Sequence, residues 1–213
     1  MLKIINQIPK DIEELLYNFD NDESVIYGFE KINKETSHGD IYRISNDYCL
    51  KIFDPFKMQY AQCEIDVILK IQGKEYAPKL YAYNSTKYML IEWIEGYSLH
   101  EYVDKYDKLP TNFTDNIYNV EIDMVNSGIL YVDTKYDKHI IWLKNNVDKF
   151  KLIDYGVCDL LSTNKSIEYQ KKYISEKYEK TKKKDEDALN DLRETLLCYG
   201  IKSEHIDKFI SSL

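Results

Sequence analysis

Asp154 is the residue whose sequence context points most clearly to metal chemistry. It follows the apolar Leu152-Ile153 pair and precedes Tyr155-Gly156. A carboxylate presents the hard oxygen atoms that Mg²⁺ prefers, and Gly156 allows the backbone to turn away directly after it. Because an Asp-aromatic-Gly triplet also occurs in ordinary turns, the metal-ligand interpretation depends on the residues that accompany it.

A second carboxylate, Asp133, lies earlier in the chain and is followed at the next position but one by Lys135. The stretch between Asp133 and Asp154 contains short apolar runs that predict a hairpin. The chain therefore carries two acidic groups on either side of a hairpin-like segment. Each carboxylate is a weak signal alone, and their spacing makes the pair a stronger one.

Lys51 is the third residue that could take part in chemistry. It lies inside the otherwise apolar strand segment Tyr48–Phe53. A lysine that points inward from such a strand needs an anionic partner, because an isolated buried charge is costly. The alternative is a lysine on an edge strand that points to solvent.

The composition excludes several classes of partner. The net charge is −8 and the isoelectric point is near 5.1, which argues against a general polyanion-binding surface, since phosphate-backbone affinity depends on clustered Lys and Arg. We therefore do not expect nucleic acid as a partner. No run approaches the roughly 18 apolar residues of a membrane span, and the N-terminus has no signal-peptide pattern. These features predict a cytoplasmic protein that does not contact membrane.

Four cysteines are widely separated, and no pair has the spacing of metal ligands. We expect them to be reduced residues of the core. They are Cys49, Cys63, Cys158 and Cys198.

The first half of the chain is predicted to form strands around one helix. Apolar residues at helical spacing predict a short helix over 9–20 and a longer one over 58–72, which Gly73 closes. Short segments rich in β-branched and aromatic residues, separated by turn residues, predict five strands. These strands are 25–32, 40–44, 48–53, 78–83 and 88–94.

The second half is predicted to be mainly helical, with a domain boundary near Glu95-Gly96. Residues 1–95 would form one lobe and residues 96–213 the other, within one domain of the α+β class. Two short strands, 139–143 and 150–153, are expected between the helices. The helices are expected at 99–106, 112–127, 165–184, 185–199 and 204–213.

Five strands, an inserted helix, a linker and a helical second half follow one another as they do in the protein kinase-like superfamily. The chain resembles that superfamily from about Val25 to Tyr199. The resemblance implies a bilobal kinase-like fold, with a five-stranded antiparallel sheet and one helix in the N-terminal lobe and a mainly helical C-terminal lobe. It also implies ATP and Mg²⁺ as cofactors.

The resemblance assigns roles to the candidate residues. Lys51 would anchor the nucleotide phosphates and pair with Glu64 on the following helix, and Asp154 would bind the metal. Asp133 would accept or orient the proton of the acceptor hydroxyl, and Lys135 would contact the transferred phosphate.

Two further segments resemble nucleotide-binding parts of the family. In the segment Leu90 to Leu99, the backbone at Glu92 and Ile94 would pair with adenine, and Ile91 would lie behind it. In the turn Ser37-His38-Gly39-Asp40, only Gly39 leaves a backbone amide clear for the phosphates. Asp40 would lie close to those phosphates.

The chain departs from the family pattern in the catalytic loop and after it. Tyr131-Val132 stand where His and Arg are usual, which implies that no phosphorylated activation loop acts as a switch. Aligning the apolar pair Ile140-Ile141 places His139 in the position of the second metal ligand, whereas strict counting places Lys138 there. No Ala-Pro-Glu motif follows Gly156.

The leading interpretation is a minimal, atypical Ser/Thr kinase of the small bacterial or RIO-like type that transfers the γ-phosphate of ATP to a protein hydroxyl. A second interpretation is a pseudokinase that binds nucleotide and acts as an interaction module, favoured by the missing Asn and the weak glycine loop. A third is a small-molecule kinase of the aminoglycoside or choline type, for which a missing activation segment is permissive. An unrelated α+β protein is the remaining alternative.

Overall fold

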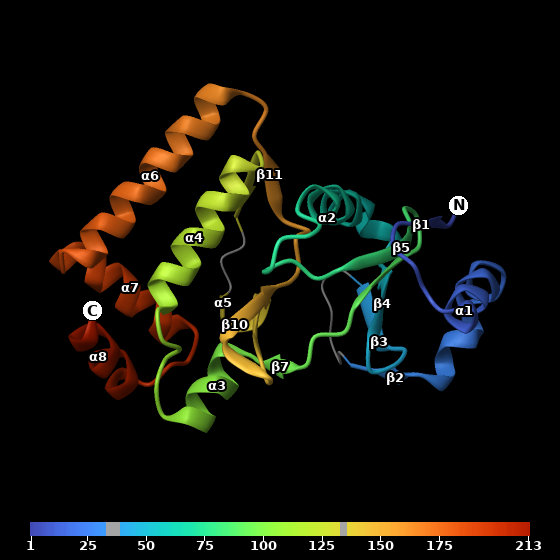
Figure 1. Cartoon of the computed structure of the whole chain (residues 1–213), viewed down its shortest axis with the longest axis horizontal. Helices are drawn as coiled ribbons and strands as arrows, with labels where there is room; N and C mark the ends of the chain where they lie inside the picture. Colours follow the sequence, from blue (N-terminus) through green and yellow to red (C-terminus); the bar gives the residue numbers. More distant parts are fainter. Residues whose placement is uncertain (33–38, 133–135) are drawn as a thin grey trace. The chain divides into compact units, whose positions relative to one another are not determined.

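The chain forms a mixed α+β structure (Figure 1), which confirms the predicted class. The computed structural model describes residues 1–32, 39–132 and 136–213. The chain divides into two compact units, Met1–Ile94 with Asp154–Val157, and Glu95–Ile153 with Cys158–Leu213. The first division falls at the expected boundary near Glu95, but Asp154–Val157 join the first unit rather than the second.

The first unit is built on a six-stranded antiparallel sheet with the strand order β1-β5-β6-β4-β3-β2. The strand β1 was not predicted, because a two-residue segment carries no periodic signal. The strands are β1 Lys3–Ile4, β2 Glu30–Lys31, β3 Gly39–Arg43, β4 Tyr48–Phe53, β5 Leu80–Asn84 and β6 Tyr88–Glu92.

The predicted strand over residues 25–32 is wrong for most of its length. A 3-10 helix, η1 (Glu23–Gly28), occupies its first part, and only β2 is extended. The Asp22 side chain accepts a hydrogen bond from the backbone N–H of Ser24 and caps this helix. Ile26 is buried in the core that η1 shares with the sheet. Local capping and burial thus override the β propensity of Val25 and Ile26.

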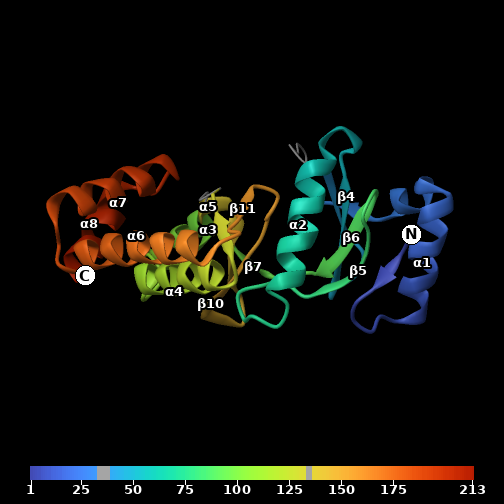
Figure 2. The same cartoon turned by 90° about the horizontal axis from the view of Figure 1, so that it is seen from above.

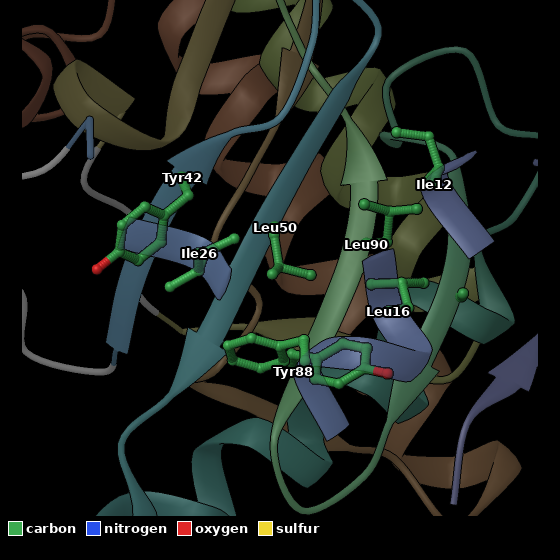
Figure 3. Packing of buried hydrophobic residues seen from close by; sticks show 9 residues of the cluster. Ile12, Leu16, Ile26, Tyr42, Leu50, Tyr88 and Leu90 are labelled. Atoms are coloured by element: carbon green, nitrogen blue, oxygen red, sulfur yellow. The ribbon is translucent and has the colours of Figure 1, made fainter. Parts of the chain in front are cut away.

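Two helices cover opposite faces of this sheet, α1 (Lys10–Asn21) on one and α2 (Met58–Lys70) on the other (Figure 2). Figure 3 shows Ile12 and Leu16 of α1 and Ile26 of η1 lying against Leu50 and Leu90 of the sheet. The buried residues of α1 recur at three- and four-residue intervals, as the sequence predicted.

The helix α2 begins after a short 3-10 turn, η2 (Pro55–Lys57), and buries one side among apolar residues. The Asp54 side chain accepts a hydrogen bond from the N–H of Phe56 at 2.9 Å and starts this turn. Among the buried residues of α2 is one charged side chain, Glu64. After the helix, Gly73 adopts a φ of +85°.

The second unit combines helices with two small sheets, of strand orders β10-β9-β7 and β11-β8. The strands β9 and β10 form the hairpin expected between Asp133 and Asp154. The strands are β7 Gly96–Tyr97, β8 Ile129–Tyr131, β9 Ile140–Leu143, β10 Asn146–Leu152 and β11 Cys158–Leu160; the helices are α3 Leu99–Tyr106, α4 Phe113–Asn126, α5 Tyr136–His139, α6 Asn164–Lys182, α7 Glu186–Cys198 and α8 Ser203–Ser212.

The long helices α4 and α6 lie side by side (Figure 1). The Tyr118 and Tyr178 rings stack between them with centroids 4.0 Å apart. The core of this unit is aromatic, and the fully buried Trp142 contacts Phe113 and Phe150. The predicted helices of the second half are confirmed to within a few residues at each end.

None of the four cysteines, all of which are described, forms a disulfide, and not all of them are core residues. Cys49 is buried and Cys198, at the end of α7, is exposed, so the predicted burial is wrong for Cys198. In the described ranges, none of the helices has the length and apolar character that crossing a membrane requires.

Candidate functional site

The candidate site of the first unit begins with Lys51 on β4. This strand pairs with β3 on one side and β6 on the other, so it is not an edge strand. In the register of the sheet, Lys51 lies opposite Ile41 and Met89. Only 6% of Lys51 is exposed, which rules out the solvent-facing alternative and requires a partner for its charge.

Glu64 is that partner. The Lys51 Nζ donates to both carboxylate oxygens of Glu64, at 2.9 and 2.7 Å. Glu64 is 3% exposed and projects from α2. A bidentate contact between two buried charged groups is short and directional, and here it joins β4 to the helix.

Asp154 is the third member of the group. Its Oδ1 lies 3.4 Å from the Lys51 Nζ, so the ammonium contacts two carboxylates from distant parts of the sequence. Asp154 has a φ of +61°, a left-handed conformation that is uncommon outside glycine. Such conformations persist where surrounding contacts hold them and are concentrated at functional sites.

The residues after Asp154 pack against α2. The Cys63 Sγ donates to the Tyr155 carbonyl oxygen at 3.6 Å, and Tyr155 is 1% exposed. A side chain added at Gly156 would stand 3.5 Å from the Tyr60 Cβ. The Asp-Tyr-Gly segment is therefore held against the same helix that carries Glu64.

Burial and charge act in opposite directions on this group. Burial disfavours the Lys51 ammonium, but the carboxylates of Glu64 and Asp154 outweigh it and raise the pKa of Lys51. Burial raises the pKa of Glu64 despite the attraction of Lys51, and the nearby Asp154 carboxylate adds to this rise. The carboxylates therefore favour the charged form of Lys51, whereas burial disfavours the charged form of Glu64.

One ammonium faces two carboxylates, which leaves a surplus of negative charge at Asp154. The Asp154 side chain is 29% exposed, whereas that of Glu64 is 4% exposed. Mg²⁺ is commonly held by one or two carboxylates together with waters and substrate phosphates. Within the described ranges no three His, Cys, Asp or Glu side chains are grouped to hold a metal, and the metal-ligand role of Asp154 stays a prediction.

The predicted adenine-binding segment includes the end of β6, which stops at Glu92 rather than at Ile94. The Glu92 N–H donates to the Lys79 carbonyl at 2.8 Å, and the Trp93 N–H donates to the Asp47 carbonyl at 2.9 Å. Ile91 and Ile94 are half-buried. Backbone hydrogen bonds therefore hold this segment up to Trp93. Its adenine contacts stay a prediction.

Gly39 has a structural role in the sheet, and its role at a nucleotide phosphate stays a prediction. It starts β3 with a φ of +144°, and a Cβ at this position would lie 2.0 Å from the Ile52 carbonyl oxygen. The neighbouring Asp40 pairs with Lys31 at 2.7 Å. This ion pair offsets the negative charge of Asp40, which was predicted to lie near the phosphates of a bound nucleotide. Residues 37 and 38 of the predicted phosphate turn lie outside the described residues.

The predicted catalytic residues Asp133 and Lys135 lie outside the described residues. In the second unit, His139 is 8% exposed, and its Nδ1 is hydrogen-bonded to the Tyr131 hydroxyl at 2.9 Å. The same hydroxyl donates to the Ile153 carbonyl at 3.3 Å. Lys138 is exposed. His139 thus takes part in the packing of its own unit, and its metal-ligand role stays a prediction.

Sequence reasoning missed the residues that hold the Asp-Tyr-Gly segment. Cys63 could have been identified from the sequence, because it directly precedes Glu64 on the same helix and its thiol can donate a hydrogen bond. Nothing in the sequence pointed to Tyr60.

No protein-family model matches this chain, and no curated protein matches it.

Proposed function

We propose that this chain is an ATP- and Mg²⁺-dependent phosphotransferase of the bilobal protein kinase-like type, acting on a hydroxyl of a protein in the cytoplasm. The observation that carries the proposal is the contact of Lys51 with Glu64 at 2.7 Å and with Asp154 at 3.4 Å. The resemblance to the kinase family had already grouped these three residues, although Asp154 lies far from Lys51 and Glu64 in the sequence.

The chemistry of this group suits the β- and γ-phosphates of a nucleotide. Phosphoryl transfer depends on positioning and on the stabilisation of negative charge rather than on covalent chemistry by the protein. Lys51 is a buried cation whose charge Glu64 maintains, and Asp154 supplies oxygen atoms to a metal. When bound, Mg²⁺ would neutralise the phosphate oxygens and orient the transferred group.

The remaining roles come from the resemblance. Glu92 and Ile94 would bind adenine through their backbones, with Ile91 behind the ring, and Gly39 would leave room for a phosphate. Asp133 would accept the proton of the acceptor hydroxyl, and Lys135 would contact the transferred phosphate.

The proposal is tested by transfer of label from γ-labelled ATP, with Mg²⁺ present, to casein or to the protein itself. We expect transfer by the wild type and a loss of at least about 100-fold in Asp133→Asn, because general base catalysis contributes about that much. Lys51→Met should also lose transfer. Asp148→Asn is the matched control, since Asp148 is an exposed aspartate of β10. Equal transfer by the wild type and Asp133→Asn would contradict the proposal.

A nucleotide-binding pseudokinase is the second candidate, because Lys138-His139 stands where the family has the Asn that binds the second metal. ATP-induced thermal stabilisation of the wild type without label transfer would support this candidate. A small-molecule kinase of the aminoglycoside or choline type is the third, and it would transfer label to an added small alcohol and not to protein.

A further inference from the structure

A surface cavity of about 480 Å³ lies wholly within the second unit. The segment between α3 and α4, the first turn of α4, the end of α6 and the helix α8 line it. These elements are labelled in Figure 1. Small-molecule sites in proteins commonly have volumes of about 300–1,000 Å³. The cavity therefore has the size of a ligand site.

Three lysines line this cavity in a chain whose net charge is −8: Lys108, Lys182 and Lys208. Lys182 contacts Asp115 at 2.7 Å, and Lys208 contacts Asp107 at 3.3 Å. Lys108 is exposed and forms no ion pair with any residue in the described ranges. Three ammonium groups thus face two side-chain carboxylates, so the side chains at the cavity carry a surplus of positive charge.

The N-terminus of α4 adds backbone donors to the same cavity. Its N-cap residue, Asn112, has a φ of +58° and its side chain makes no capping hydrogen bond. Asn112, Thr114 and Asp115 all line the cavity. The first N–H groups of a helix have no partner inside the helix, and together with the helix dipole they attract anions.

A buried histidine provides an independent observation. His205 lines the cavity and is 4% exposed. Its Nε2 contacts the Asp107 Oδ1 at 2.7 Å, but its buried Nδ1 has no hydrogen-bond partner in the described part of the chain. A buried polar atom without a partner is costly, and a molecule that enters the cavity can supply one after a small movement of the ring.

We propose that this cavity binds a small organic phosphate. The phosphate would lie against Lys108, Lys182 and the N–H groups of Thr114 and Asp115 in the first turn of α4. The organic part would lie against Leu109 and Phe209, which are apolar lining residues, and a hydroxyl of the ligand would donate to the Nδ1 of His205. This site is built from residues other than those of the proposed nucleotide site.

The test is calorimetric titration with phenyl phosphate at low salt, with inorganic phosphate as the comparison. We expect phenyl phosphate to bind more tightly than inorganic phosphate, because only the ester buries apolar surface. Lys108→Gln and Lys182→Gln should each weaken binding roughly tenfold, the loss expected for one charge-assisted hydrogen bond. Lys172→Gln is the matched control, since Lys172 is an exposed lysine of α6 that does not line the cavity.

Two outcomes would overturn the proposal. One is the absence of binding of phenyl phosphate at millimolar concentration. The other is binding that neither lysine variant weakens, which would indicate an adventitious ion only. Asp154→Asn should bind phenyl phosphate as the wild type does, so the result does not depend on the proposed nucleotide site.

Discussion

Removing either charge of the Lys51–Glu64 pair should destabilise the first unit far more than removing both. Lys51→Met and Glu64→Met each keep an unbranched side chain of similar length and remove one charge. Each single variant leaves the other charge buried and without its bidentate partner, because the side chains are only 8% and 4% exposed. The double variant leaves two apolar side chains in contact.

The expected magnitudes follow from this burial. Removing one partner of a buried ion pair costs about 3–5 kcal/mol of unfolding free energy. Lys51→Met should fall in the lower part of that range, because burial raises the pKa of Glu64 and lets it take up a proton instead. The double variant should be within about 2 kcal/mol of the wild type, since apolar replacement of such pairs is often close to neutral. The coupling free energy, which is the sum of the two single losses minus the double loss, is then at least about 4 kcal/mol.

Urea unfolding of the first unit can be followed by tryptophan fluorescence. The chain has two tryptophans, and Trp93 belongs to the first unit whereas Trp142 belongs to the second. In a Trp142→Phe host, the fluorescence of Trp93 reports on the unit that contains the pair. All four members of the cycle are compared in this host, so the effect of the host substitution cancels.

The matched control is the exposed pair Lys172 and Glu176 on α6, with its charged atoms 3.7 Å apart. Changing both to Met should give a coupling free energy below about 0.5 kcal/mol. A coupling at Lys51 and Glu64 as small as that of the exposed pair would refute the claim that they form a buried, mutually dependent pair.

Three further predictions concern other parts of the chain. Gly39→Ala should lower the midpoint of urea unfolding and cost more than about 1 kcal/mol, because its Cβ would meet the Ile52 carbonyl at 2.0 Å; an unchanged midpoint would contradict this. Burial raises the pKa of the Cys49 thiol to about 12, so a thiol reagent at pH 8 should label the exposed Cys198 and leave Cys49 unlabelled until urea is added. Hydrogen bonds, first from Lys182, lower the pKa of Asp115. Asp115→Asn should therefore lower the free energy of unfolding at pH 7, and this difference from the wild type should disappear as the pH falls through the lowered pKa. A difference that stays constant down to pH 2 would argue against the ion pair.

Periodic segments of the fold could be predicted from the sequence. The strand β4 and the helix α3 have the bounds that their residue patterns indicated, because the side chains that define each pattern are buried on one face or in the sheet interior. The segment 25–32 could not be predicted, since a side-chain cap from Asp22 and the burial of Ile26 decide its conformation. Capping and tertiary burial of this kind leave little trace in local composition.

The candidate site, too, could be predicted only in part. The Lys51–Glu64 pair could be predicted, because a lysine inside an apolar strand requires a carboxylate and the resemblance to the kinase family pointed to Glu64. The left-handed conformation of Asp154 and the hydrogen bond from Cys63 to Tyr155 could not. Both depend on contacts between segments that are far apart in the chain.

The measurement that tests the central claim most directly is calorimetric titration of ATP into the wild type and Asp154→Asn, each with and without Mg²⁺. If Lys51, Glu64 and Asp154 hold a metal-bound nucleotide, the wild type binds ATP tightly only with Mg²⁺, and Asp154→Asn loses this dependence on the metal. Asp148→Asn, the exposed control, should behave as the wild type does. Binding of ATP by Asp154→Asn with the affinity and Mg²⁺ dependence of the wild type would contradict the account.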